Sequence, residues 1–350
     1  QPLEPIPLTA SELTWAGAIS VEPLPDGAVQ PWRLPWDRKP LFHSDLRQRC
    51  ASAAGVRLTF VSDTDTLELG VQLDEQPDRW DGQYDLFIDG QLHQRLSAYE
   101  HDQTLRFEGL PAGEHLIELW LAQYPEGIVT SLAIDAGASV QAFEDSRPRW
   151  VTYGSSITHN ACAFGPSETW PSLVARAADL QLTNLGYGGA CHLDPVVGFM
   201  IRDMPADMIS LKLGINVQGA NSLNFRSFGP AVTGLLLSIR ERHPDTPLAV
   251  VSPIFSNERE TEPNKVGMTL PTMRDTLGEC VEAMRSLGDQ HIAYFDGLTL
   301  LGPDAADYLH DRLHPDEAGQ HYVAKNFLQH VAPWLGMTPK HDVVREDVLR

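Results

Sequence analysis

The chain has 350 residues, 42% of them hydrophobic and 21% charged, which is the balance of a globular protein with one or two folded cores. Its formal net charge is −21, from 47 acidic and 26 basic side chains, and a field of this sign repels nucleic acid and anionic membranes. We therefore expect no nucleic-acid partner, and no membrane span either, because no apolar run approaches the roughly 18 residues that a span requires.

The four cysteines, at positions 50, 162, 191 and 280, show no C-x-x-C spacing and are too few for a disulfide scaffold. We expect reduced, partly buried thiols. Cys162 and Cys191 lie near candidate catalytic loops, so a pocket role or a disulfide is the alternative for them. The sequence holds no signal peptide, which favours a cytoplasmic protein. Its first residue is Gln rather than Met, so a leader that has been cleaved is the other possibility.

Residues 1–147 show the pattern of an all-β domain. Residues 66–73 alternate apolar and polar side chains, as a half-buried strand does. In residues 84–94, Asp89-Gly90 separates two β-prone arms, which is a strong hairpin signal. Short strands separated by turn residues predict a β-sandwich or jelly-roll-like domain.

A different pattern begins after residues 143–150, which are predicted to be a linker because Pro148 interrupts strand pairing. Short apolar runs then alternate with helix-length segments, which predicts β-α-β units, a mainly parallel sheet and helices on both of its faces. We place this α/β domain at residues 148–336 and a tail with a short docking helix at residues 337–350. The expected strands lie at residues 150–153, 182–186, 207–214, 248–252 and 292–296, and the helices at 168–180, 228–243 and 270–288.

Glycine and polar residues gather where these strands end, and in an open parallel sheet such ends carry the reactive groups. A serine hydroxyl becomes a nucleophile when an imidazole accepts its proton and a carboxylate orients that imidazole. The sequence offers a serine, a glycine-lined backbone, an amide side chain, and an Asp three residues before a His. These groups lie in four blocks: GSS at 154–156, NLGYGGA at 184–190, GIN at 214–216 and HDRLHPDEAG at 310–319.

The same blocks offer donors for the oxyanion that forms when a serine attacks a carbonyl. The candidates are the backbone N–H groups of Ser156 and Gly189 and the side-chain amide of Asn216. Glycine at 189 permits a close approach of the backbone to a substrate. Each such donor contributes roughly 2.7 to 4 kcal/mol in comparable enzymes.

In their order and separation, the four blocks resemble those of the SGNH, or GDSL-type, hydrolases over roughly residues 149–335. The resemblance implies a three-layer α/β/α, flavodoxin-like domain with a Ser-His-Asp triad and an oxyanion hole. An all-β N-terminal domain also occurs in branches of this family, among them carbohydrate deacetylases and an acyltransferase branch that tailors polyketides. Carried over by position, the implied triad is Ser156, His314 and Asp311, and the implied oxyanion hole is Ser156, Gly189 and Asn216.

Two positions depart from the family pattern. Ser155 stands where the Asp of Gly-Asp-Ser is usual, and Val217 stands where the third block often has Asp. Neither position belongs to the triad, so the chemistry survives both changes. They put in doubt the hydrogen bonds around the nucleophile and the assignment to a subfamily.

The histidine block contains a second D-x-x-H pair, Asp307 with His310, beside Asp311 with His314. His310 and His314 are also spaced like a zinc pair, which requires one continuous helix through both. Pro315 instead indicates that a helix begins there, with His314 on the loop that enters it. We therefore favour Asp311 and His314 as a triad pair, with no metal.

Other interpretations of the blocks are weaker. The NLGYGGA block lacks the full dinucleotide-binding pattern, so we expect no cofactor. Asn216 as a plain helix cap is the alternative to an oxyanion role. His159 and His192 are candidate pocket residues, and packed or surface positions are an equal alternative for them. Trp170 is a further candidate for substrate contact, although packing is the stronger expectation.

These observations predict a serine-dependent O-acyl ester hydrolase acting on an acylated carbohydrate or small metabolite. The main alternative is an O-acyltransferase that moves an acyl group from a thioester or ester donor to a hydroxyl of a natural product such as a polyketide. The two reactions share every catalytic residue. A noncatalytic ligand-binding protein on the same scaffold is the third alternative.

Overall fold

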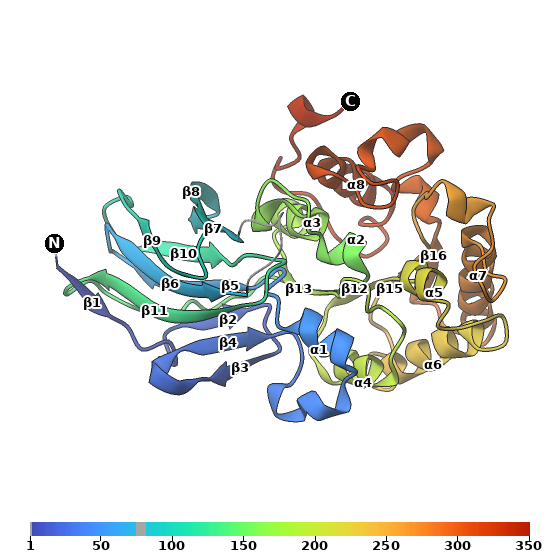
Figure 1. The fold of residues 1–350 in the computed structure, drawn as a ribbon, viewed down its shortest axis with the longest axis horizontal. Helices are drawn as coiled ribbons and strands as arrows, with labels where there is room; N and C mark the ends of the chain where they lie inside the picture. Colours follow the sequence, from blue (N-terminus) through green and yellow to red (C-terminus); the bar gives the residue numbers. More distant parts are fainter. Residues whose placement is uncertain (1, 75–81) are drawn as a thin grey trace. The chain divides into compact units, whose positions relative to one another are not determined.

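The computed structural model describes residues 2–74 and 82–350, and the chain forms two compact units (Figure 1). The N-terminal unit comprises Gln1–Ser146 and the short segment Phe164–Ser167, and the C-terminal unit comprises Arg147–Ala163 and Glu168–Arg350. In the described part of the chain, no helix combines the length and the apolar character needed to cross a membrane.

The N-terminal unit is built from two antiparallel sheets, as the alternating sequence pattern predicts, together with one short helix, α1 (Ser44–Cys50). One sheet has the order β3 (Ser20–Pro23), β4 (Val29–Trp32), β11 (Gly127–Asp135), β6 (Leu67–Leu73) and β9 (Asp102–Phe107), with β1 (Leu3–Pro5) paired to β11. The other has the order β2 (Thr14–Ala16), β5 (Arg57–Ser62), β10 (His115–Trp120), β7 (Gly82–Ile88) and β8 (Gln91–Ala98).

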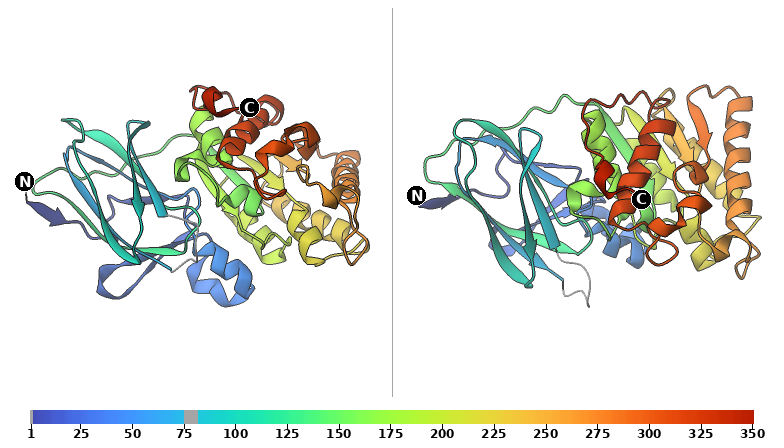
Figure 2. Two further views of the ribbon diagram at one scale, coloured as in Figure 1. Left: turned by 45° about the horizontal axis from the view of Figure 1, so that its top comes forward. Right: turned by 90° about the horizontal axis from the view of Figure 1, so that it is seen from above.

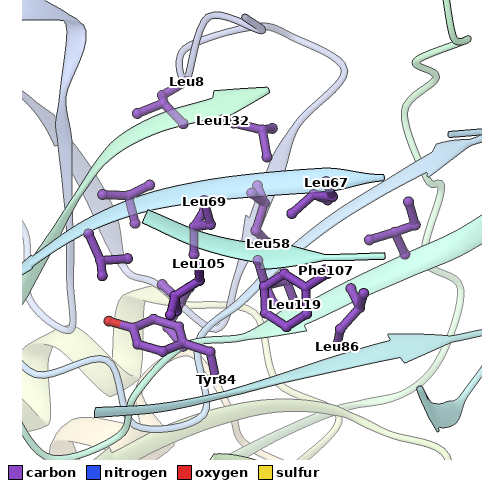
Figure 3. Close-up of a cluster of buried hydrophobic side chains, with 14 of the residues drawn as sticks. Leu8, Leu58, Leu67, Leu69, Tyr84, Leu86, Leu105, Phe107, Leu119 and Leu132 are labelled. Carbon is purple, nitrogen blue, oxygen red and sulfur yellow. The ribbon is translucent and has the colours of Figure 1, made fainter. Parts of the chain in front are cut away.

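Apolar side chains from both sheets fill the space between them (Figure 3). On β6, Leu67, Leu69 and Val71 have no exposed surface, because every second residue of the strand faces the other sheet. The predicted hairpin connects β7 to β8 through Asp89 and Gly90, both at positive φ, as the favoured two-residue turns require.

A buried carboxylate lies beside this hairpin. Asp85 on β7 has no exposed surface and accepts two hydrogen bonds from the guanidinium of Arg95 on β8, at 2.6 and 3.0 Å. It also accepts the backbone N–H and the hydroxyl of Ser167, at 3.0 and 2.6 Å. These bonds satisfy the buried charge and hold the segment Phe164–Ser167 within the N-terminal unit.

The C-terminal unit contains one five-stranded sheet in which every pairing is parallel. Its order is β13 (Gln181–Gly186), β12 (Arg149–Gly154), β14 (Met208–Lys212), β15 (Leu248–Val251) and β16 (Ile292–Phe295). Numbered within the unit this is 2-1-3-4-5, the flavodoxin-like order. The fold class implied by the sequence is therefore confirmed.

Helices cover both faces of this sheet, because right-handed crossovers on either side of β12 leave them on opposite faces. Trp150 of β12 packs against Trp170 and Phe327, which lie on the helices of one face. Figures 1 and 2 show α3 and α8 on that face and α4 and α6 on the other. The bounds are α3 (Trp170–Ala178), α4 (Pro195–Asp203), α6 (Phe228–Arg240), α7 (Leu270–Ser286) and α8 (Glu317–His330).

The docking helix expected in the tail is not formed. Within residues 337–350 the helical structure is a single 3-10 turn, Glu346–Val348. The backbone N–H groups of Lys340 and His341 instead bond to the carbonyl of Ala177, at the end of α3. These two backbone N–H groups are thus paired with α3 rather than with carbonyl groups of a helix in the tail.

Candidate active site

The site lies where the order of the parallel sheet reverses. From β12 the chain passes to β13 on one side, and from β13 it crosses back to β14 on the other side. The loops that follow β12 and β14 diverge at such a point and leave a crevice at the carboxyl ends of the strands. Ser156 follows β12 and Asn216 follows β14, so the topology places these two residues at the carboxyl ends of neighbouring strands.

The nucleophile loop is a sharp strand-to-helix turn. Gly154 ends β12, and a Cβ atom there would overlap the side chain of Thr158 one turn later. Ser155 is the N-cap of the short helix α2 (Ser156–His159), and its hydroxyl accepts the N–H of Ile157 at 3.1 Å. Asp and Ser are comparable N-caps. Ser155 therefore makes the N-cap hydrogen bond that the Asp of Gly-Asp-Ser could have made, and the doubt about hydrogen bonds at this turn is removed.

Ser156, His314 and Asp311 form one hydrogen-bonded chain. The hydroxyl oxygen of Ser156 is 2.8 Å from Nε2 of His314, across 158 positions of sequence. Nδ1 of His314 is 2.6 Å from Oδ2 of Asp311. This arrangement suits a hydroxyl whose proton passes to an imidazole that a carboxylate orients.

Asp311 is held as a carboxylate by its surroundings. Burial raises its pKa, but the hydrogen bond from the His314 ring and those from the backbone N–H groups of His314 and Leu313 outweigh burial and lower the pKa to about 2. One oxygen accepts the two backbone groups, so the other is left for the ring. Arg312, at a φ of 68°, gives the turn that makes this possible.

The three oxyanion donors that the sequence blocks predict each keep a donor group available. The N–H of Ser156 lies in the first turn of α2, where a helix has no internal acceptor for it. Gly189 is exposed at a φ of 70°, and its N–H has no acceptor among the described residues. Asn216, second residue of α5 (Ile215–Ala220), accepts the N–H of Cys191 at 3.0 Å through Oδ1, which leaves its Nδ2 group as a donor.

His192 contacts the backbone of Gly189, the predicted oxyanion glycine. One ring nitrogen is 3.0 Å from the carbonyl oxygen of Gly189, and the other is 2.8 Å from the hydroxyl of Ser222. His192 is partly exposed beside Gly189, and its pocket role stays a prediction. The positioning contact to Gly189 has no signal in the sequence.

His159 and Trp170 occupy packed positions, and here the sequence expectation of a pocket role needs correction. His159 has no exposed surface, and its Nδ1 accepts the backbone N–H of Gly188 at 3.1 Å. Trp170 is 1% exposed and donates from its indole N–H to the carbonyl of Ile157 at 2.7 Å. His159 belongs to α2 and Trp170 bonds to it, and both side chains lie within the core, so neither exposes a surface to a substrate.

The second D-x-x-H pair is not arranged as a triad. Nε2 of His310 lies 3.3 Å from the sulfur of Cys162, and residues 310–315 form a turn rather than the continuous helix that the zinc interpretation requires. The side chains of His310, Asp311 and His314 nevertheless lie together, with one ligand atom of each within 4.8 Å of the others. None of the four cysteines forms a disulfide, so the disulfide alternative for Cys162 and Cys191 is wrong.

Comparison with known families identifies the family of the chain. Residues 148–332 match the model of the GDSL-like lipase/acylhydrolase family. The chain belongs to this family. Residues 13–130 match a second model, described as the N-terminal domain of SsfX3. A comparison with curated protein sequences gives no match.

Solved structures show the same two-part architecture. The chain is similar to a salicylyl-acyltransferase, SsfX3, from a tetracycline biosynthetic pathway, with 31% identity and a TM-score of 0.90 over 98% of this chain and 99% of that one. A GDSL-like lipase from Bacteroides ovatus shares the fold at 20% identity and a TM-score of 0.79, over 97% of this chain and all of that one. A family two carbohydrate esterase from Cellvibrio japonicus shares it at 14% identity and 0.67, over 96% and 98%.

Proposed function

We propose that this protein transfers an acyl group, through an ester on Ser156, from an activated ester or thioester donor to a hydroxyl of a small acceptor molecule. The hydrogen-bonded chain from Ser156 through His314 to Asp311 supports the acyl-enzyme, with distances of 2.8 and 2.6 Å. The observation that favours transfer is the 31% identity to a salicylyl-acyltransferase across both domains, over 98% of the chain. Hydrolysis, which the sequence pattern favoured, is thereby the second candidate.

In the first half-reaction, Nε2 of His314 accepts the Ser156 proton while the hydroxyl oxygen attacks the donor carbonyl. The negative charge on the carbonyl oxygen is met by the N–H groups of Ser156 and Gly189 and by the amide of Asn216. His314, now a cation beside the Asp311 carboxylate, returns the proton to the departing alcohol or thiol. The product of this step is an acyl ester on Ser156.

In the second half-reaction, the acceptor hydroxyl loses its proton to His314 and attacks the acyl ester. The same three donors hold the second oxyanion, and His314 then returns the proton to Ser156. Water in place of the acceptor makes the enzyme an esterase. Water reaches this site, since the side chain of His314 is 32% exposed, and this favours hydrolysis as a competing outcome.

The proposal is tested by product analysis. Purified protein is incubated with an aryl ester or an N-acetylcysteamine thioester, with and without a panel of phenolic, polyketide-like and sugar alcohols. Transfer predicts a new ester that appears only with a matching alcohol, at the expense of free acid. Free acid alone, whatever the alcohol, makes the protein an esterase.

A fluorophosphonate probe tests the shared acyl-enzyme step separately. Intact-mass analysis should show one adduct on the wild type and none on Ser156→Ala. Absence of labelling together with absence of turnover would leave only the ligand-binding alternative.

A further inference from the structure

A second cluster of reactive side chains lies against the triad. Cys162 is on the loop after α2, and His310, Asp311 and His314 are on the turn before α8, all within the C-terminal unit. The sulfur of Cys162 is 3.3 Å from Nε2 of His310, and that nitrogen is 4.0 Å from Oδ2 of Asp311. Neither Cys162 nor His310 has a part in acyl transfer.

We propose that Cys162, His310, Asp311 and His314 form a binding site for Zn²⁺ that turns the enzyme off. The inhibition by Zn²⁺ rests on the proposed function, because the ion binds His314, the base of the triad. The binding of Zn²⁺ does not depend on the proposed function.

The donor set matches the chemistry of zinc. Thiolate sulfur, imidazole nitrogen and carboxylate oxygen are the ligands that tetrahedral zinc sites use, with bonds of about 2.0 to 2.3 Å. Two ligand atoms on one such ion are then about 3.3 to 3.6 Å apart. The Cys162–His310 distance of 3.3 Å already has this value. Ca²⁺ and Mg²⁺ are disfavoured, since they take oxygen ligands.

The ligand atoms of His310, Asp311 and His314 lie within 4.8 Å of one another, whereas Cys162 lies outside this group and must move toward Asp311 and His314 to complete the site. The 4.0 Å between His310 and Asp311 must shorten, and the 2.6 Å between Asp311 and His314 must lengthen, each by well under about 1 Å to meet tetrahedral spacing. The side chains of His310, Asp311 and His314 are 29%, 41% and 32% exposed, respectively. They are therefore in contact with solvent, from which an ion can reach them. A chain of net charge −21 also attracts cations.

Zinc at this position acts on the tautomer of His314. As a general base, His314 carries its proton on Nδ1, bonded to Asp311, and its Nε2 accepts from Ser156. With zinc on Nδ1, a neutral imidazole carries its proton on Nε2 instead. That nitrogen then donates to the Ser156 oxygen and no longer accepts its proton, so the nucleophile is not activated.

The protons balance in this step. The His314 proton moves from Nδ1 to Nε2, so the ring stays neutral. The Cys162 thiol loses one proton to solvent as its sulfur binds the ion, and His310 binds as a neutral ring. Oxidation states do not change.

Zinc inhibition of ester turnover is measured after chelator treatment, for the wild type and for Cys162→Ser and His310→Ala. We expect wild-type activity to fall with added Zn²⁺ and to return with chelator. Both variants should keep wild-type activity without zinc, within about twofold, and need at least about 10-fold more zinc for half-inhibition, as weakened metal sites do. The matched controls are Cys280→Ser and His291→Ala, which remove a cysteine and a histidine elsewhere and should be inhibited like the wild type.

Binding is measured independently of activity with Co²⁺ as the probe. A thiolate-to-cobalt charge-transfer absorption should appear in the wild type, in Cys280→Ser and in the inactive Ser156→Ala, and should be absent in Cys162→Ser. Its presence in Ser156→Ala supports the metal site even if the proposed function fails. Equal zinc inhibition of all variants, or a cobalt spectrum without the thiolate band in the wild type, would overturn the proposal.

Discussion

Gln320 and Asn160 are joined by a hydrogen bond of 3.0 Å between their side chains, although 160 positions of sequence separate them. Gln320 lies on α8, directly after the His314 turn, and Asn160 ends the nucleophile helix α2. The same Gln320 amide donates to the carbonyl of Pro315 and accepts the backbone N–H of Trp170. One fully buried side chain therefore connects the loop that carries His314 to the helix that carries Ser156.

We expect Gln320→Met to lower kcat by about 10- to 100-fold, because a misplacement of about 1 Å between reacting groups has an effect of this size. The free energy of unfolding should also fall by about 1 to 3 kcal/mol, because the groups that Gln320 satisfies are left unpaired. Steady-state kinetics and urea denaturation measure the two effects. Gln329→Met, at an exposed position of the same helix, is the control. Equal kcat in both variants would contradict the positioning role.

Asp311→Asn should lower kcat by about 10⁴-fold, because the amide no longer holds the active tautomer of His314. Asp307→Asn changes the other D-x-x-H pair in the same way and should leave kcat within about twofold of the wild type. Ester turnover by both variants decides between the pairs. A large loss of kcat in Asp307→Asn with little loss in Asp311→Asn would show that Asp307 and His310, and not Asp311 and His314, are the triad pair.

Asn216→Ala should lower kcat by about 10²- to 10³-fold with little change in KM, because an oxyanion donor acts mainly in the transition state. The fluorophosphonate probe should still label Ser156, more slowly. Asn257→Ala removes an exposed asparagine from a nearby loop of the same unit and serves as the comparison. If Asn216 were only a helix cap, its variant would lose stability while keeping kcat.

Lys212, at the carboxyl end of β14, is 4% exposed, and burial lowers its pKa to about 7. In an unfolded chain a lysine has a pKa of about 10.4, so between pH 7 and 10 the unfolded state binds the additional proton. Stability from this group therefore rises with pH, by up to about 1.4 kcal/mol per unit.

The measurement compares urea denaturation of the wild type and Lys212→Met from pH 7 to 9. The difference in the free energy of unfolding, wild type minus variant, should grow with pH. A difference that stays constant over this range would show that Lys212 keeps an ordinary pKa when folded.

The all-β and the α/β architecture could both be predicted from the sequence, because each depends on the pattern of neighbouring residues along the chain. The alternation of apolar and polar residues at 66–73 indicates a half-buried strand, and β6 forms there. Asp89-Gly90 indicates a tight turn, and it connects β7 to β8. The apolar runs of the second half likewise become β12 to β16. The helices α4 and α5 were missed, as their sequences are short and interrupted by glycine.

The candidates Ser156, Gly189, Asn216, Asp311 and His314 could be proposed from their blocks because each predicted chemical role demands one residue type. The roles of Ser155, His192 and Gln320 could not, since polar residues of these kinds serve equally on any surface. For His159 and Trp170 the packed alternative is confirmed over the pocket role, and the choice needed the structure because proximity in sequence to Ser156 does not tell which way a side chain points.

Residue types and local periodicity are properties of the chain, and they were enough to define two domains of opposite pattern and the parts of an acyl-transfer site. Whether those parts meet is decided by the tertiary structure, because residues 156 and 314 follow different strands of the sheet, β12 and β16, and come within 2.8 Å only in the folded chain. The contact of Cys162 with His310 arises in the same way, from two loops whose approach no local pattern encodes.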